Sequence, residues 1–161
     1  MSDFSTRATP AAAAEATARL LAVRLEDVAG RGVPVASLRG APVILVYAGR
    51  RGADAAVKLG IALQERLAPR VVRPRIVPVA CLGEVPAVFR GLARAQLRQA
   101  AAGGEILVDF DRGLELAIGM RADVANVALL DAAGTIMGLV RGAGESCVRE
   151  VEILIEHLTM A

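Results

Sequence analysis

The sequence predicts an α/β protein in which one mixed β-sheet has helices on both of its faces. The continuous apolar run at residues 43–48 is typical of a strand that is buried on both sides, and residues 75–82 are expected to form a second buried strand. Each of the two is followed by a segment in which apolar side chains recur with helical spacing, at 54–67 and 85–101. A hairpin and a final helical segment complete the chain, and this order favours a sheet between two helical layers.

The segment before the first apolar run divides into two parts. Residues 1–20 are rich in Ala and Thr, and we expect an N-terminal arm or a short helix there. Two short extended pieces around Gly30–Gly32 and a single turn at Ala36–Leu38 follow. Because 161 residues suit one domain with a single core, residues 21–161 are expected to form that domain.

The middle of the chain contains two helices and a strand with an unusual residue. Val57 and Ile61 fit the first helix, which ends before Pro69 because proline cannot continue a helix. The strand at 75–82 contains Pro78, which removes a donor from the ladder, so we expect a bulge or a position near an edge. The second helix stops at Gly103–Gly104, and its apolar side comprises Val85, Val88, Phe89, Leu92 and Leu97.

The last third of the chain predicts a hairpin and a closing helix. "EILVDF" is typical of a short strand and "LELAIGM" of a short helical turn. Asp131–Gly134 joins two apolar strands in a hairpin, and Ser146 is placed as the N-cap of the final helix. The apolar stripe of that helix consists of Val148, Val151, Leu154, Ile155 and Leu158.

Charge and composition exclude several classes of protein. The formal net charge is +2, the basic residues are dispersed and only 2% of residues are aromatic, so no nucleic-acid partner is expected. No apolar stretch approaches the roughly 20 residues that span a bilayer, and the first residues do not resemble a secretory signal. We therefore expect a cytoplasmic protein without a membrane partner. An apolar content of 55% and a mean hydropathy of +0.49 favour a homo-oligomer such as a dimer.

Cysteine and histidine are too few and too dispersed for a metal site. Cys81 and Cys147 are far apart in the sequence, and His157 is the only histidine. We therefore expect no metal and no cofactor. Asp109 and Asp111 in "VDFDRG" favour turn chemistry over a catalytic carboxylate pair.

Two stretches of the sequence resemble the thioredoxin fold in its peroxiredoxin/TlpA-like (redoxin, alkyl-hydroperoxide-reductase-like) branch. The first is "LEDVAGRGVPVASLRGAPVILVYAG", which is similar to the opening hairpin, turn and central strand of that branch. The second is "VALLDAAGTIMGLVRGAG", which is similar to its later hairpin. The resemblance covers about residues 23–158 and implies a three-layer sandwich. The matching residues are Leu38, Arg39, Gly40, Pro42, Asp131, Gly134 and Gly142.

The chain departs from the features that carry the function of this branch. The resemblance places a reactive thiol at the start of the first long helix, around Gly52 to Ala55, where the helix N-terminus favours a thiolate. No residue there is a nucleophile, and Arg50 and Arg51 replace the expected aromatic approach. The resemblance also implies a cis-proline near Ala125, where there is no proline. A member without these groups is not expected to carry out dithiol exchange or peroxide reduction.

The first functional hypothesis is a redox-inactive domain that acts by binding a protein partner and associates with itself. Its partner groove would be formed by residues 47–54, 81–85 and 125–127, with Tyr47, Ala125 and Asn126 as contact residues. This hypothesis leans against an enzyme.

Two alternatives remain open from the sequence. Cys81 ends the second strand at the carboxyl edge of the sheet and could be a displaced redox or sensor thiol, or a packed apolar residue. Arg50, Arg51, Gly52 and Asp54 could bind a small anion or a cofactor at a helix start, or form a solvated loop in which Asp54 caps the helix.

Overall fold

The computed structural model describes residues 9–160. The strands form one seven-stranded sheet in the order β2-β1-β5-β4-β3-β6-β7. They are β1 (Arg24–Asp27), β2 (Gly32–Pro34), β3 (Val43–Ala48), β4 (Arg75–Cys81), β5 (Leu107–Asp109), β6 (Asn126–Leu130) and β7 (Ile136–Arg141). The α-helices are α1 (Pro10–Leu21), α2 (Ala53–Leu67), α3 (Arg90–Ala101), α4 (Gly113–Ile118) and α5 (Glu145–Met160).

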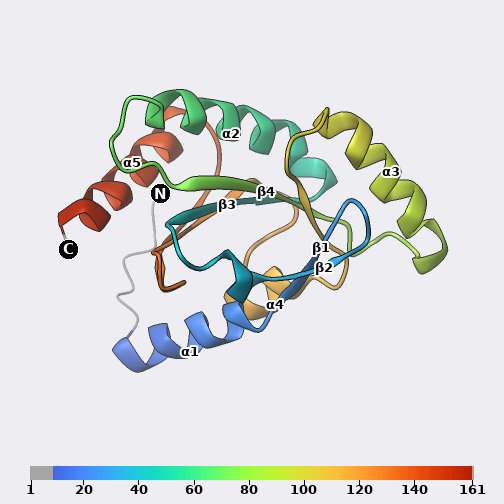
Figure 1. Cartoon of the computed structure of the whole chain (residues 1–161), viewed down its shortest axis with the longest axis horizontal. Coiled ribbons are helices and arrows are strands. Elements are labelled where there is room, and N and C mark those ends of the chain that lie inside the picture. Colours follow the sequence, from blue (N-terminus) through green and yellow to red (C-terminus); the bar gives the residue numbers. More distant parts are fainter. Residues whose placement is uncertain (1–8, 161) are drawn as a thin grey trace.

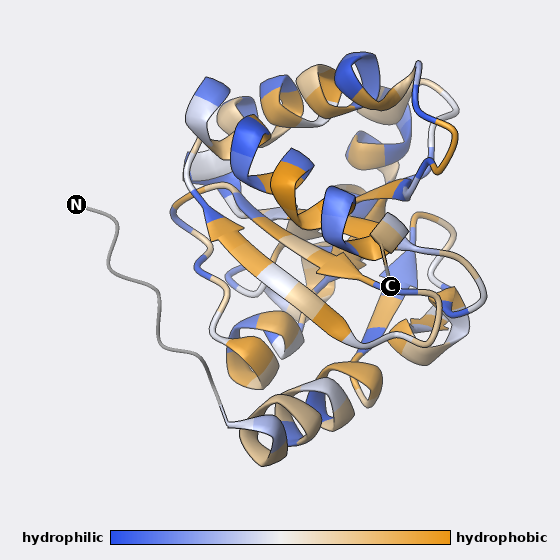
Figure 2. Ribbon diagram, turned by 90° about the vertical axis from the view of Figure 1, so that its left-hand side faces the viewer, coloured by the Kyte–Doolittle hydropathy of each residue, from blue (hydrophilic) through white to orange (hydrophobic). Residues whose placement is uncertain are grey.

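The sheet is mixed and lies between two layers of helices, which confirms the predicted α/β sandwich. β3, β4 and β5 are parallel, and the other neighbouring strands pair antiparallel. Helices α2 and α5 cover one face, and α1 and α4 cover the other (Figure 1). Figure 2 shows the orange, hydrophobic strands between these two layers. The two faces bury separate hydrophobic clusters.

Strand β3 is the centre of both clusters, because all six of its residues are buried. Side chains alternate along a strand, so successive residues enter opposite faces. Leu45 and Tyr47 pack on the side of α1 and α4, and Ile44 and Val46 pack on the side of α2 and α5. The apolar run in the sequence therefore marks the strand that has helices on both sides.

Strand β4 lies inside the sheet even though it contains Pro78. It pairs with β3 residue by residue from Arg75 to Ala80 without a shift of register. Its pairing with β5 begins only at Val79. Pro78 therefore lies in the half of the strand that has a neighbour on one side, where a missing N–H is tolerated. The predicted bulge is wrong, whereas a local edge accounts for the proline.

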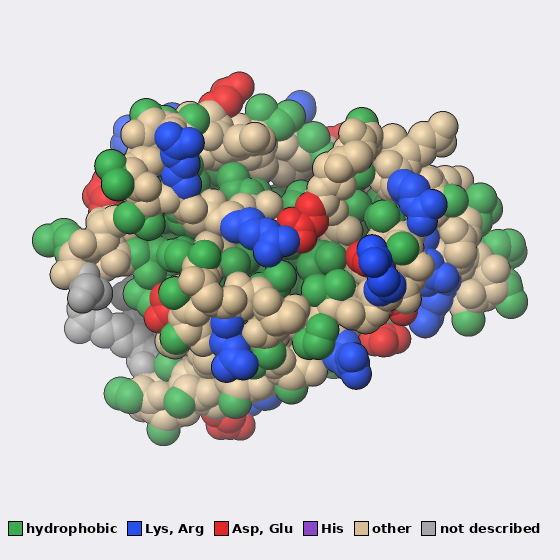
Figure 3. Space-filling view, viewed as in Figure 1, with side chains coloured by type: hydrophobic (Ala, Val, Ile, Leu, Met, Phe, Trp, Pro, Cys, Tyr) green, Lys and Arg blue, Asp and Glu red, His purple; other side chains and the backbone are tan. Residues whose placement is uncertain are grey.

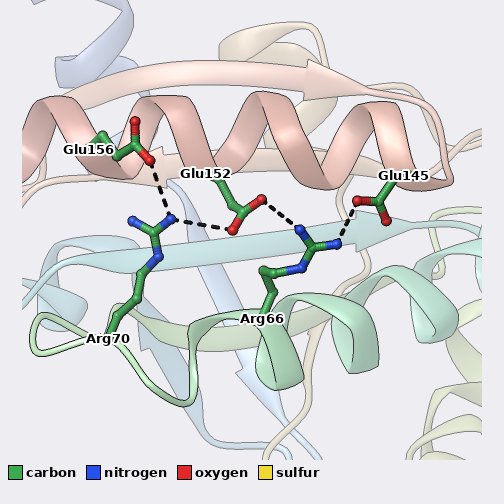
Figure 4. Close-up of polar contacts among 5 residues, drawn as sticks. All are labelled: Arg66, Arg70, Glu145, Glu152 and Glu156. Carbon is green, nitrogen blue, oxygen red and sulfur yellow. Dashed lines mark hydrogen bonds and ion pairs between the residues drawn. The ribbon is translucent and has the colours of Figure 1, made fainter.

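Helices α2 and α5 are joined by a network of ion pairs (Figure 4). Arg66 contacts Glu145 and Glu152, and Arg70 contacts Glu152 and Glu156. Most of these groups are partly exposed, and exposed pairs each contribute only about 0–1 kcal/mol. Because two arginines share Glu152, the network fixes how the helices lie beside each other more than it stabilises the fold.

Helix α3 has a different buried side from the one that the sequence predicts. It begins at Arg90, after the short 3-10 turn η3 (Ala87–Phe89), and all of its residues are at least partly exposed. Arg90 and Arg94 lie over the ring of Phe110, and Arg94 also pairs with Glu26. The apolar residues of η3 and of the first turn of α3 are in solvent: Val88, Phe89 and Leu92 are 83%, 55% and 60% exposed. Arginines rather than apolar side chains therefore hold α3 to the body of the protein.

The closing helix follows its predicted stripe but starts earlier than predicted. Val148, Val151 and Ile155 are buried, with Leu154 and Leu158 partly buried beside them. The helix begins at Glu145, so Ser146 lies within the first turn and is not the N-cap. The amide of Val148 donates to the carbonyl oxygen of Gly144, which has a positive φ of 88° that suits glycine.

Two isoleucines of α5 provide a matched test of this packing. Ile155 is fully buried, whereas Ile153 is 48% exposed. We expect Ile155→Ala to lower the free energy of unfolding by about 2–5 kcal/mol, because it leaves a cavity in the core. Ile153→Ala should change it by less than about 1 kcal/mol. Urea denaturation of both variants measures the difference, and equal effects would contradict the assigned face.

Candidate functional site

The turn between β3 and α2 lies directly against the loop that precedes β6. The amide of Gly49 donates to the carbonyl oxygen of Ala122 at 2.8 Å. A Cβ atom added at Gly52 would lie 2.7 Å from the carbonyl carbon of Val124, closer than real side chains come to a backbone. The two segments therefore meet through their backbones, and this approach requires glycine at the turn.

Asn126 holds the second segment in place. Its side-chain oxygen accepts a hydrogen bond from the amide of Arg121 at 3.0 Å. Its side-chain nitrogen lies within 3.2 Å of the carbonyl oxygens of Arg121, Val124 and Tyr47, and donates to them. Since Asn126 is buried, these bonds satisfy both the side chain and the loop backbone.

The predicted partner groove is closed in the structure. Tyr47, Ala125 and Asn126 are at most 2% exposed, and Cys81 is 8% exposed. Backbone packing between the turn and the loop fills the space in which the sequence resemblance placed a groove. These residues therefore belong to the core and do not form a contact surface.

The arginines of the predicted anion site are exposed, but the start of α2 is not capped by Asp54 as predicted. Arg50 and Arg51 are exposed, and within residues 9–160 their side chains form no ion pair and no hydrogen bond. Gly52 is the N-cap of α2 and is buried, while Asp54 lies in the first turn without capping it. Asp54 is therefore not the cap, and anion binding here stays a prediction.

A group of polar side chains lies at the carboxyl ends of β3, β4 and β5, where parallel sheets place their sites. Tyr47 has a buried hydroxyl that finds no hydrogen-bond partner among the described residues. Burial raises the pKa of Tyr47, and a polar contact with the thiol of Cys81 raises it further. That contact does not have the geometry of a hydrogen bond, so the hydroxyl is left beside the sulfur without a partner.

Arg112 and Asp109 complete this group in different ways. Arg112 has a positive φ of 55°, which is strained for a residue with a side chain, and its chain lies over Gly83. Its pairing with Glu115 at 2.7 Å raises the pKa of Arg112, and nearby Cys81 and Tyr47 act in the same direction. Asp109 is fully buried, and its carboxylate accepts hydrogen bonds from the amides of Gly113 and Leu114. Asp109 therefore caps the start of α4, which confirms the expected turn chemistry.

The two cysteines lie on opposite faces of the sheet. Cys81 packs in the cluster on the side of α1 and α4, whereas Cys147 packs in the cluster on the side of α2 and α5. Burial, with a smaller effect of Glu150, raises the pKa of Cys147 to about 11. Because the sheet separates them, the two thiols cannot act as a pair.

Residues 9–160 contain no group of three His, Cys, Asp or Glu side chains that could hold a metal ion. In the same part of the chain, every helix is too short or too polar to cross a bilayer.

An open, largely apolar groove lies between α2 and α3. It has a volume of about 920 Å³, and Val57 and Ile61 of α2, Leu97 of α3 and Ile106 are among its lining residues. Figure 3 shows hydrophobic side chains in the hollow between these helices. The sequence does not reveal this groove, because α2 carries two apolar stripes: Leu59, Leu63 and Leu67 are buried, whereas Val57 and Ile61 are 61% and 53% exposed.

Comparisons with known proteins identify the architecture. No family model and no curated protein match the chain. An uncharacterized thioredoxin-like protein from Porphyromonas gingivalis matches 88% of this chain and 92% of its own, with a TM-score of 0.63 and 21% identity. An exposed lipoprotein thioredoxin from Streptococcus pneumoniae matches 83% and 98%, with a TM-score of 0.56 and 18% identity. The chain has a thioredoxin-like fold. A thiol peroxidase from Chromobacterium violaceum, at 15% identity and a TM-score of 0.56 over 84% of this chain and 82% of its own, is similar too.

The close contact at the turn predicts opposite effects of the same substitution at two glycines of this region. Gly52→Ala should lower the free energy of unfolding by about 1–3 kcal/mol, because the backbone of Val124 must move away. Gly60→Ala, inside α2, has open space around the new methyl group and should raise it by about 0.5–1 kcal/mol. Thermal and urea denaturation test both. A neutral Gly52→Ala would mean that the turn and the loop do not pack as described.

Proposed function

We propose that this thioredoxin-like domain acts by binding, through the apolar face between α2 and α3, and does not carry out dithiol exchange or peroxide reduction at the start of α2. The observation that carries the proposal is the turn before α2. It contains no sulfur, and Gly52 is packed against the backbone of Val124. A substrate disulfide would meet neither a nucleophile nor an open groove there.

The positions of the cysteines support the same proposal. Dithiol exchange needs two thiols close enough to form a disulfide, with Cα atoms within about 7 Å. Cys81 and Cys147 are both buried, in clusters on opposite faces of the sheet. The structural relatives include proteins named for thioredoxin and thiol peroxidase activity, but a shared fold does not carry the chemistry of a site.

The apolar face supports binding as the remaining role. Large apolar side chains that stay exposed on a folded domain commonly mark interaction surfaces. Here Val57 and Ile61 of α2 and Val88, Phe89 and Leu92 at the start of α3 are all more than half exposed. On the opposite edge of the same face, α5 covers the sheet with a buried stripe.

Reduction of insulin by dithiothreitol tests the absence of dithiol chemistry. We expect the native protein to leave the rate at the uncatalysed level, equal to that of a control variant with both Cys81→Ser and Cys147→Ser. Acceleration by the native protein that the control variant lacks would overturn the proposal.

A second candidate function is a single reactive thiol at Cys81, which the unpartnered hydroxyl of Tyr47 favours. With hydrogen peroxide, the sulfur of Cys81 would attack one peroxide oxygen, forming an S–O bond as the O–O bond breaks. The sulfur is oxidised and the peroxide reduced, and the leaving hydroxide takes the thiol proton and departs as water. The sulfenic oxygen would supply the acceptor that the hydroxyl of Tyr47 lacks.

Mass spectrometry after peroxide and dimedone treatment at pH 7–8 tests this candidate, with Cys147 as the internal control. Cys147 should stay unlabelled, because its pKa of about 11 keeps it protonated. If Cys81 is the reactive thiol, it should be labelled in the native protein. Tyr47→Phe should then slow the labelling of Cys81 roughly three- to tenfold, because the lost hydrogen bond contributes about 1 kcal/mol. Labelling of Cys81 only after unfolding would remove the candidate.

A further inference from the structure

We propose that the groove between α2 and α3 is occupied by a second copy of this chain, in a twofold dimer. The start of α3 in each copy, with Val88, Phe89 and Leu92, would lie in the groove of the other copy. This inference rests on the proposed binding function and names its partner.

The start of α3 is free to serve a second molecule because its own fold does not use its apolar side. Arg94 is paired with Glu26, Arg90 and Arg94 lie over Phe110, and Arg98 donates to the carbonyl oxygen of Val28. These contacts hold the helix through its arginine side. The apolar side chains at its start are left in solvent at more than half exposure.

The groove supplies a complementary surface on the same molecule. Its lining is largely apolar, with Val57 and Ile61 on one wall and Leu97 on the other. A twofold axis presents the same two features from each copy, so one contact made twice covers both apolar surfaces. A pairing that covered only one of them would leave the other in water.

Charge complementarity favours a second copy over a foreign partner. Lys58 is exposed beside Val57 and Ile61, and Glu84 is exposed shortly before Val88. Within residues 9–160, the side chains of Lys58 and Glu84 form no ion pair and no hydrogen bond. When the start of α3 enters the groove of another copy, Glu84 of one molecule approaches Lys58 of the other, and this pair occurs twice. Arg90 and Arg94 of α3 are already paired with Asp111 and Glu26 of their own chain.

Sedimentation equilibrium of the full chain tests the dimer. Total protein concentrations from about 1 to 300 µM cover roughly the range that separates weak from standard interfaces. We expect a concentration-dependent dimer whose dissociation constant rises at least about tenfold in Ile61→Asp and in Phe89→Asp. Leu116→Asp on α4 is the matched control, since Leu116 is 81% exposed but lies on the other layer. It should leave the dissociation constant unchanged, and circular dichroism checks that all variants are folded.

A charge exchange tests the pairing itself. Lys58→Glu and Glu84→Lys should each weaken the dimer several-fold, and the double variant should restore it. A native protein that stays monomeric throughout would overturn the inference, as would a dimer unaffected by Ile61→Asp and Phe89→Asp. Single variants that weaken the dimer without rescue would refute the Lys58–Glu84 contact. A monomer that also fails to reduce insulin would refute only the second copy as partner, whereas insulin reduction would refute the proposed function.

Discussion

The close approach of two backbone segments, the turn before α2 and the loop before β6, is the contact on which the character of this protein depends. Gly49 and Gly52 allow it, since side chains at these positions would collide with Ala122 and Val124. Asn126 fixes the loop by bonding its backbone on both sides. At the place where the resemblance implies a reactive thiol, the structure therefore has a packed junction.

The two faces of the sheet are completed to different degrees. On one face, α1 and α4 enclose a continuous cluster that includes Tyr47 and Cys81. On the other face, α5 and the leucines of α2 cover β3, β6 and β7, but α3 does not close over β4. The arginine side of α3 finds its partners near β1 and β5, which leaves an apolar groove beside α2. A helix anchored by charge rather than by apolar packing is the physical cause of the open surface.

The buried polar groups differ in whether they have hydrogen-bond partners among residues 9–160. Asp109 and Asn126 are buried and bonded to backbone groups, so both stabilise their loops. The hydroxyl of Tyr47 is buried without such a partner, and an unsatisfied group of this kind costs about 1–3 kcal/mol. It lies beside a thiol and a strained Arg112, at the edge of the sheet where parallel strands end. That coincidence sets Cys81 apart from Cys147, whose pKa is raised by burial and by Glu150.

The strands and the order of the elements can be predicted from local patterns of the sequence. The continuous apolar run of β3, the turn at Asp131–Gly134 and the stripe of α5 are local patterns whose burial follows from periodicity, and each lies where the pattern predicts it. The thioredoxin-like architecture could be predicted from the same patterns and their order. The amino-acid sequence also shows directly that no cysteine lies at the start of α2.

Which surfaces are open depends on contacts between residues that are far apart in the sequence. The predicted groove at Tyr47, Ala125 and Asn126 is closed, because backbone segments far apart in sequence meet there. The apolar side of α3 is exposed, because Arg94 finds Glu26 and Phe110, neither of which is close to it in sequence. A periodic pattern shows which side chains share a face of a helix. It cannot show which of two faces is held against the core when charged and aromatic groups from distant strands compete for the helix.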